Sequence, residues 1–250
     1  MIARRASLLS SVAAVLAAVA CTNSFEIPIE TPIRPKLDVS PFQRVLVAGF
    51  IAGGTEDVDG NLETTRLLRS QLRTKSELRV IDSDVLPLQD VAIEGRNGES
   101  GGAAPPPIKE QKDLEAYEHV FANVEYWKRI GEEYQNPLIV TGTVLFTPLQ
   151  RNQIVQREQE VYDSFGRRRV VPVRTYQERK GFSLDGRFIF IDGRSGTTLH
   201  SESFNEQILY NANQTTPALS SYFELMDRLI PSFLSTLSSQ KIKGTRILLQ

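Results

Sequence analysis

The stretch Arg44-Val-Leu-Val-Ala-Gly-Phe50, followed by Gly53-Gly54, decides the fold of this 250-residue chain. Its residues are almost all apolar, and several are β-branched. A short run of this kind, closed by glycines, is typical of a strand that is covered on both faces. We therefore predict that residues 44–50 form the first strand of a sheet with helices packed against it.

The residues that follow predict a β-α-β unit. After a turn rich in Asp and Gly, Asn61 is the expected cap of a helix. Residues 78–81 are expected to form a second short strand after this helix. The apolar stripe of the helix consists of Leu62, Thr65, Leu68 and Leu72.

The remaining elements extend the sheet and its cover. A helix is expected over residues 114–134, with Trp127 on its apolar stripe as part of the core. The other expected elements are a strand at 137–146, a hairpin of 184–191 and 197–204, and a helix from Pro217 in which Pro231 can introduce a kink. This order predicts an α/β or α+β fold of three layers, in which helices flank a mixed sheet.

Residues 152–162 and 168–180 flank the turn 163–166 and predict a long inserted β-hairpin. Both faces carry charges, and each Arg or Lys at the middle of a bilayer costs about 2 to 4 kcal/mol, so we expect neither face to contact lipid. We interpret the hairpin as a water-exposed arm, which either decorates the sheet or offers a docking edge. For the arginines at its tip, a solvated turn is the alternative to a binding role. The candidate partner-binding residues are Arg167, Arg168, Arg169 and Tyr176.

Cys21 is the only cysteine, and a leader typical of secretion precedes it. Arg4 and Arg5 are followed by an uncharged run, residues 6–20, that is too short to span a bilayer. The segment resembles a bacterial lipobox. This resemblance implies cleavage after residue 20, lipidation of Cys21 with fatty acids such as palmitate, and sorting to the outer membrane because Thr22 is not Asp. The alternative is an ordinary secretory signal that leaves a free thiol, whereas acylation consumes it.

Two segments are expected to lie outside the folded core. Residues 21–40 carry several prolines and few positions for an apolar face, so we predict an extended, lipidated tether. Residues from about 94 to 108 are rich in Gly and Pro and are predicted to form a disordered surface loop. A single periplasmic domain is expected over residues 41–250.

Four segments together resemble the superfamily shared by the amino-terminal domain of TolB, LpoB and CsgG. They are residues 45–50, 67–72 before 78–82, 138–144 and 186–196. The resemblance covers roughly residues 41–239 and implies an envelope protein that binds other proteins, with no enzyme active site.

The residue types present give catalysis little to build on. Without Arg4 and Arg5 the chain has 27 basic and 30 acidic residues, which does not favour nucleic acid as a partner. His119 and His200 are the only histidines, and no second cysteine or His-x-x-x-His pattern accompanies them. Asp57 and Asp59 lack the ligand spacing of a calcium loop, and Gly49, Gly53 and Gly54 lack the Gly-Lys-Ser of a phosphate loop. We expect no enzyme, no metal and no cofactor.

The leading hypothesis is a lipid-anchored periplasmic protein that binds another envelope protein. Two alternatives stay open: a subunit of a CsgG-like oligomeric export assembly, and a periplasmic hydrolase or polysaccharide-binding protein.

Overall fold

The computed structural model describes residues 24–94, 107–162, 164–211, 214 and 216–249. The leader, Cys21 and most of the predicted Gly- and Pro-rich loop lie outside these residues. The chain divides into two units, one of residues 36–238 and one formed by the segments on either side of them.

The larger unit is built on a five-stranded sheet in the order β3-β2-β4-β5-β6, in the described part of the chain. Strand β2 is parallel to β3 and β4, whereas β4, β5 and β6 are antiparallel to one another. The strands are β2 (Arg44–Gly54), β3 (Arg79–Val80), β4 (Leu138–Tyr162), β5 (Arg168–Asp192) and β6 (Thr198–Tyr210). The predicted mixed sheet is therefore confirmed.

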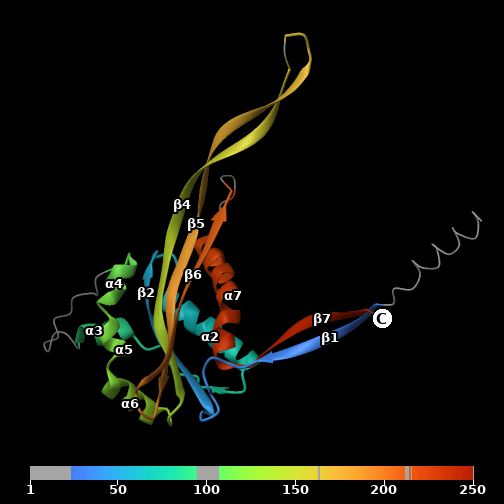
Figure 1. Cartoon of the computed structure of the whole chain (residues 1–250). Helices are drawn as coiled ribbons and strands as arrows, with labels where there is room; N and C mark the ends of the chain where they lie inside the picture. Colours follow the sequence, from blue (N-terminus) through green and yellow to red (C-terminus); the bar gives the residue numbers. More distant parts are fainter. Residues whose placement is uncertain (1–23, 95–106, 163, 212–213, 215, 250) are drawn as a thin grey trace, which may run out of the picture. The chain divides into compact units, whose positions relative to one another are not determined.

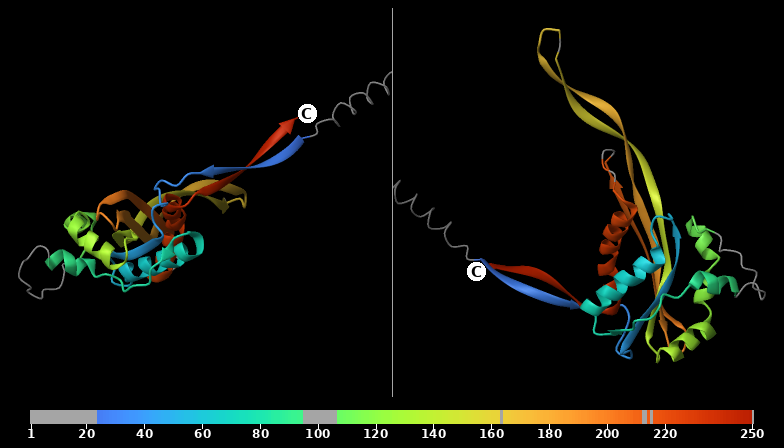
Figure 2. Two further views of the ribbon diagram at one scale, coloured as in Figure 1. Left: turned by 90° about the horizontal axis from the view of Figure 1, so that it is seen from below. Right: turned by 180° about the vertical axis from the view of Figure 1, so that it is seen from behind.

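Helices cover both faces of this sheet, which confirms the three-layer fold (Figures 1 and 2). One face packs against α2 (Gly60–Lys75) and α7 (Ala218–Leu237), the other against four short helices. These are α3 (Leu88–Glu94), α4 (Gln111–Glu115), α5 (Glu118–Phe121) and α6 (Val124–Glu133). None of the described helices has an apolar stretch long enough to cross a membrane.

Alternation along β2 explains why its sequence is continuously apolar. Val45 and Val47 lie in the core with α2 and α7, while Leu46 and Ala48 lie in the core on the opposite side. All four side chains are buried. Since successive residues of a strand point to opposite faces, both sets must be apolar when both faces are covered.

A bulge in β2 is stabilised by side chains and loops from several elements. The carbonyl oxygen of Val47 accepts a hydrogen bond from Arg69 Nη2 at 2.8 Å, and that of Gly49 accepts one from Thr141 Oγ1 at 2.8 Å. The Phe50 amide donates to Asn61 Oδ1 at 2.7 Å. The pKa of the Arg69 guanidinium is lowered, and the main cause is its burial.

Two predicted helices differ from the structure. The side chain that caps α2 is Asp59, which accepts from the Leu62 amide at 3.0 Å, because Asn61 is used by the bulge instead. The predicted helix 114–134 is divided into α4, α5 and α6, and Asn123 caps the last of these. Trp127 is fully buried, as expected, and its Nε1 donates to the carbonyl of Val120 at 2.9 Å.

The smaller unit is a two-stranded antiparallel ribbon of β1 (Ser24–Ile33) and β7 (Gln240–Leu249). Ten residue pairs join the strands, from Ser24 opposite Leu249 to Ile33 opposite Gln240. This differs from the expected tether, because a distant segment pairs with residues that read locally as a proline-rich linker. Ile108 also differs from the expected loop, since it is buried in the core beside α3 and α4.

Gly142 is a position where only glycine fits, and it provides a test of the packing between β4 and β5. Its φ is +149°, and an added Cβ would meet the carbonyl oxygen of Arg187. We expect Gly142→Ala to lower the free energy of unfolding by at least about 3 kcal/mol, because steric overlap adds to backbone strain. The matched control is Gly166→Ala, where φ is +74° but nothing lies within 4 Å. The control should lose about 1 to 2 kcal/mol or less in urea denaturation; equal losses would contradict the prediction.

Candidate partner-binding site

The predicted arm is an extension of the two longest strands of the sheet. Pairing of β4 with β2 ends at Phe146, and pairing of β5 with β6 ends at Lys180. Beyond that point β4 and β5 pair only with each other, as far as Tyr162 opposite Arg168. We call residues 150–180 the arm; Figure 1 shows it leaving the sheet as a twisted ribbon.

Side chains of the arm are exposed on both sides. Ile154 is 70% exposed, Tyr176 63% and Phe165, in the turn, 81%. Although the arm contains many apolar residues, it adds none to the core of the unit.

The register of the arm sorts its charges onto different faces. Because directly paired residues share a face and neighbours alternate, odd-numbered positions form one face and even-numbered positions the other. Within the paired strands, the odd positions carry four arginines, four valines and no carboxylate. We call this side the arginine face: Arg151, Arg157, Arg169, Arg179, Val155, Val161, Val171 and Val173.

The even positions hold all three glutamates of the paired strands, together with basic residues that neutralise them. Arg168 forms an ion pair with Glu160. Glu178 accepts a hydrogen bond from Gln150 Nε2 at 2.6 Å and lies 3.4 Å from Lys180 Nζ. This mixed face has no net charge, so the positive charge of the arm lies on the arginine face.

The structure separates the four residues that the sequence suggested. Arg168 and Tyr176 lie on the mixed face, while Arg169 lies on the arginine face. Arg167 lies in the turn, with its guanidinium carbon 5.4 Å from the centroid of the Phe165 ring. Three further arginines, at positions 151, 157 and 179, belong to the arginine face and were not singled out by sequence reasoning. The sequence signal that could have indicated them is that all three, like Arg169, have odd-numbered positions.

The arginine face combines charge with partly buried nitrogen atoms. Arg151 Nη2 donates to Gln207 Oε1 on β6 at 2.9 Å, which fixes the arginine nearest the sheet. Arg179 Nε is buried and has no hydrogen-bond partner among the described residues. Arginine is well suited to planar, bidentate contacts with carboxylates, and the intervening valines suit apolar side chains. The chemistry of this face therefore fits an acidic, partly apolar chain.

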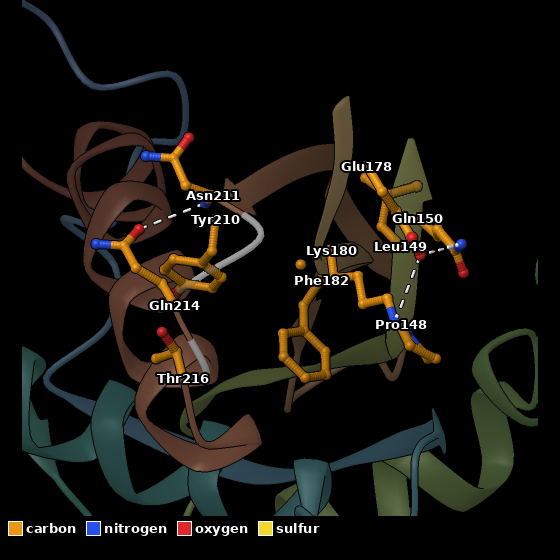
Figure 3. A pocket seen from close by; sticks show the side chains of 11 residues that line it. Pro148, Leu149, Gln150, Glu178, Lys180, Phe182, Tyr210, Asn211, Gln214 and Thr216 are labelled. Carbon is orange, nitrogen blue, oxygen red and sulfur yellow. Dashed lines mark hydrogen bonds and ion pairs between the residues drawn. The ribbon is translucent and has the colours of Figure 1, made fainter. Parts of the chain in front are cut away.

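A pocket of about 630 Å³ lies at the base of the arm (Figure 3). Phe182 and Tyr210 line it with amide side chains such as Gln150 and Gln214. Among its described lining residues Glu178 is the one carboxylate, and it is held by Gln150 and Lys180. Glycoside hydrolysis ordinarily uses two carboxylates, so the pocket lacks that arrangement.

The glycines after β2 lie at the carboxyl end of the strand, where phosphate loops occur. A pocket of about 430 Å³ lies here, but the glycines themselves contact Ile108. The Gly54 amide donates to the carbonyl of Ile108 at 2.8 Å, and a Cβ at Gly53 would overlap Ile108. The Asp59 carboxylate caps the amino-terminal end of α2. These contacts disfavour an anion at this helix end.

The two histidines lie on different elements and do not form a common site. His119 on α5 contacts the carbonyl oxygens of Ala116 and Ala92 through its two ring nitrogens, at 2.9 and 3.2 Å. His200 on β6 lies 3.8 Å from Glu202. Among the described residues no three His, Cys, Asp or Glu side chains are grouped as metal ligands.

No protein-family model and no curated protein sequence matches this chain. Among solved structures, the chain is similar to the lipoprotein GNA1162 from Neisseria meningitidis at 13% identity, over 76% of this chain and 97% of that chain, with a TM-score of 0.37. It is also similar to the PelC dodecamer from Paraburkholderia phytofirmans at 14% identity, over 85% and 98% of the two chains, with a TM-score of 0.37. Similarity of this degree leaves function to be argued from the chain's own residues.

Removal of the arm should leave the larger unit folded. We expect replacement of residues 152–178 by Asn-Gly, which forms a tight hairpin turn, to change the free energy of unfolding by less than about 1 kcal/mol. The reason is that the deleted residues contribute nothing to either core. Urea denaturation and far-ultraviolet circular dichroism measure the effect, and a loss of cooperative unfolding would show that the arm is structural.

Proposed function

We propose that this chain is a lipid-anchored protein of the bacterial envelope that binds another envelope protein through its arm. Cys21 provides the anchor, which holds the protein at the periplasmic face of the outer membrane. The arginine face provides the contact with the partner. The protein acts in assembly or biogenesis of the envelope and not as an enzyme.

The observation that carries this proposal is the sorting of charge along the arm. A ribbon that only decorated the sheet would need no distinction between its faces, since water surrounds both. Instead, the three glutamates of the paired strands lie on one face together with basic residues, and the paired positions of the other face carry arginine and valine but no glutamate. Such a face attracts acidic chains and can fix their orientation.

The character of the partner follows from the same face. Arg151 and Arg179 are directly opposite each other, Arg157 lies six residues farther along β4, and Arg169 is opposite Val161, four residues beyond Arg157. At about 3.4 Å per residue, these positions are about 20 and 14 Å apart along the arm. An extended segment with Asp or Glu at intervals of about four to six residues, and apolar side chains between them, would match this spacing. We propose such a segment on the partner protein.

The anchor is tested by metabolic labelling with radioactive palmitate. We expect the full chain to incorporate label and Cys21→Ser to incorporate none, because Cys21 is the only thiol. Both proteins should be produced from their own leader and compared after purification. Equal labelling of the two, or a complete lack of label in the unchanged chain, would remove the anchor from the proposal.

Partner binding is tested by one charge reversal on each face of the arm. Arg157 and Arg174 occupy adjacent rungs of the ribbon, opposite Val173 and Gln156, and lie on different faces. We expect Arg157→Glu to reduce recovery of the partner after crosslinking in whole envelopes at least about tenfold, since a repulsive charge at an interface costs several kcal/mol. Arg174→Glu is the control and should recover the partner normally. Equal recovery by both variants would contradict the role of the arginine face.

A subunit of an oligomeric export assembly is the alternative function. The observation in its favour is β6, a 13-residue strand at the edge of the described sheet that could pair with another chain. Light scattering of the detergent-extracted protein separates the two: a particle several times the 28.0 kDa of the chain, with no other protein in it, would favour the assembly.

A further inference from the structure

The β1–β7 ribbon changes in chemistry along its length. Its end at Ser24 and Leu249 is apolar in sequence, with Phe25 opposite Leu248 and Ile247 opposite Glu26. Basic residues follow farther along β7. They are Arg246, Lys243 and Lys241.

The two faces of the ribbon also differ. Ile27, Ile29 and Ile33 occupy alternate positions on one face and are 44%, 40% and 45% exposed. On the other face Glu30 forms ion pairs with Lys241, whose Nζ lies 3.4 Å from Oε2, and with Lys243, whose Nζ lies 3.8 Å from Oε1. The ribbon is therefore amphipathic across its thickness as well as graded along its axis.

We propose that the β1–β7 ribbon is a second membrane contact, which inserts its apolar end and isoleucine face into the interfacial layer of the bilayer that holds the lipid anchor. Arg246, which shares the isoleucine face, contacts lipid phosphates. The ribbon thus adds a protein-mediated hold to that of the acyl chains.

This inference rests on the proposed anchor, because the anchor brings the ribbon to the bilayer. Cys21 precedes Ser24 by three residues, and three extended residues reach at most about 11 Å. An acylated Cys21 therefore keeps the Ser24–Leu249 end of the ribbon within the headgroup layer or close to it. The end that must lie at the membrane is the end with the apolar residues.

The interfacial layer is also the depth that the backbone permits. A two-stranded ribbon has unpaired amide and carbonyl groups along both outer edges, which exclude it from the hydrocarbon centre. In the headgroup layer these groups can bond to water and phosphate. A two-stranded ribbon is marginally stable on its own in water, so an apolar surface that covers its isoleucine face would also stabilise its pairing.

The charge of the ribbon suits an anionic leaflet. It carries three basic residues and two acidic ones, Glu26 and Glu30. Arg246 lies opposite Ile27 and so shares the isoleucine face. A long basic side chain at such a position can keep its charged group among phosphates while its stem lies on apolar surface. One net positive charge is expected to strengthen binding to an anionic surface about fivefold.

The chain allows a direct test, because Cys21→Ser removes both the anchor and the only cysteine. The unlipidated chain of residues 21–250 with this change is mixed with vesicles of phosphatidylethanolamine and phosphatidylglycerol, and bound protein is measured by flotation. A single cysteine is then added by Leu249→Cys on the ribbon or by Ile154→Cys on the arm, and labelled with an environment-sensitive fluorophore.

We expect the unlipidated chain to float with these vesicles and to bind about fivefold more weakly to vesicles of phosphatidylcholine alone. Fluorescence of the label at position 249 should shift to the blue, and that of the label at position 154 should not. Ile27→Asp with Ile29→Asp should abolish flotation, whereas the matched change Ile154→Asp should leave it unchanged.

Three outcomes would overturn the inference. The unlipidated chain does not float, the fluorescence of both labels shifts equally, or flotation survives Ile27→Asp with Ile29→Asp. A fourth contrary outcome is that the ribbon binds a protein partner and no vesicles. Since the vesicle test uses the chain without lipid, its result is independent of palmitate labelling. The anchor and the ribbon can therefore fail separately.

Discussion

Burial of β2 on both faces is the constraint on which the larger unit depends. Successive side chains of β2 are buried on opposite faces of the sheet, so a layer of helices must cover each face. The bulge after Val47 connects β2 to a helix and to the neighbouring strand. The Val47 carbonyl accepts a hydrogen bond from Arg69 of α2, and the Gly49 carbonyl accepts one from Thr141 of β4. A buried carbonyl without a partner destabilises a protein by about 1 to 3 kcal/mol, so these side chains hold the centre of the sheet.

The arm inherits its geometry from this centre. Strands β4 and β5 are paired and buried within the sheet, and the same two strands continue as the arm. A slip of one residue in their pairing would move every side chain to the opposite face. The packing around Gly142 therefore fixes which side of the distant arm carries the arginines. In this way the core determines the orientation of the proposed binding surface, although it contributes no side chain to it.

The arm and the ribbon are both two-stranded, yet their chemistry fits different surroundings. The arm carries charge along its whole length and keeps its apolar residues between arginines or beside ion pairs. The ribbon has most of its apolar residues at one end and on one face, and the ion pairs of Glu30 with Lys241 and Lys243 on the other face. We therefore propose an acidic chain as the partner of the arm and a lipid surface as that of the ribbon. Sequence periodicity alone does not distinguish the arm from the ribbon, because side chains alternate between two faces along the strands of both.

The sequence by itself determined the three-layer mixed sheet, the burial of Trp127 and the existence of the long hairpin, because the hydrophobic pattern of a strand or helix is local. Of the candidate site, it gave the arm and Arg169 but not the face to which each arginine belongs. The break between α4 and α6 and the use of Asn61 by the bulge were decided by tertiary contacts. Tertiary structure alone also decided the β1–β7 pairing. The physical reason is that pairing and register depend on hydrogen bonds between segments far apart in the chain, and the prolines of β1 read locally as a linker.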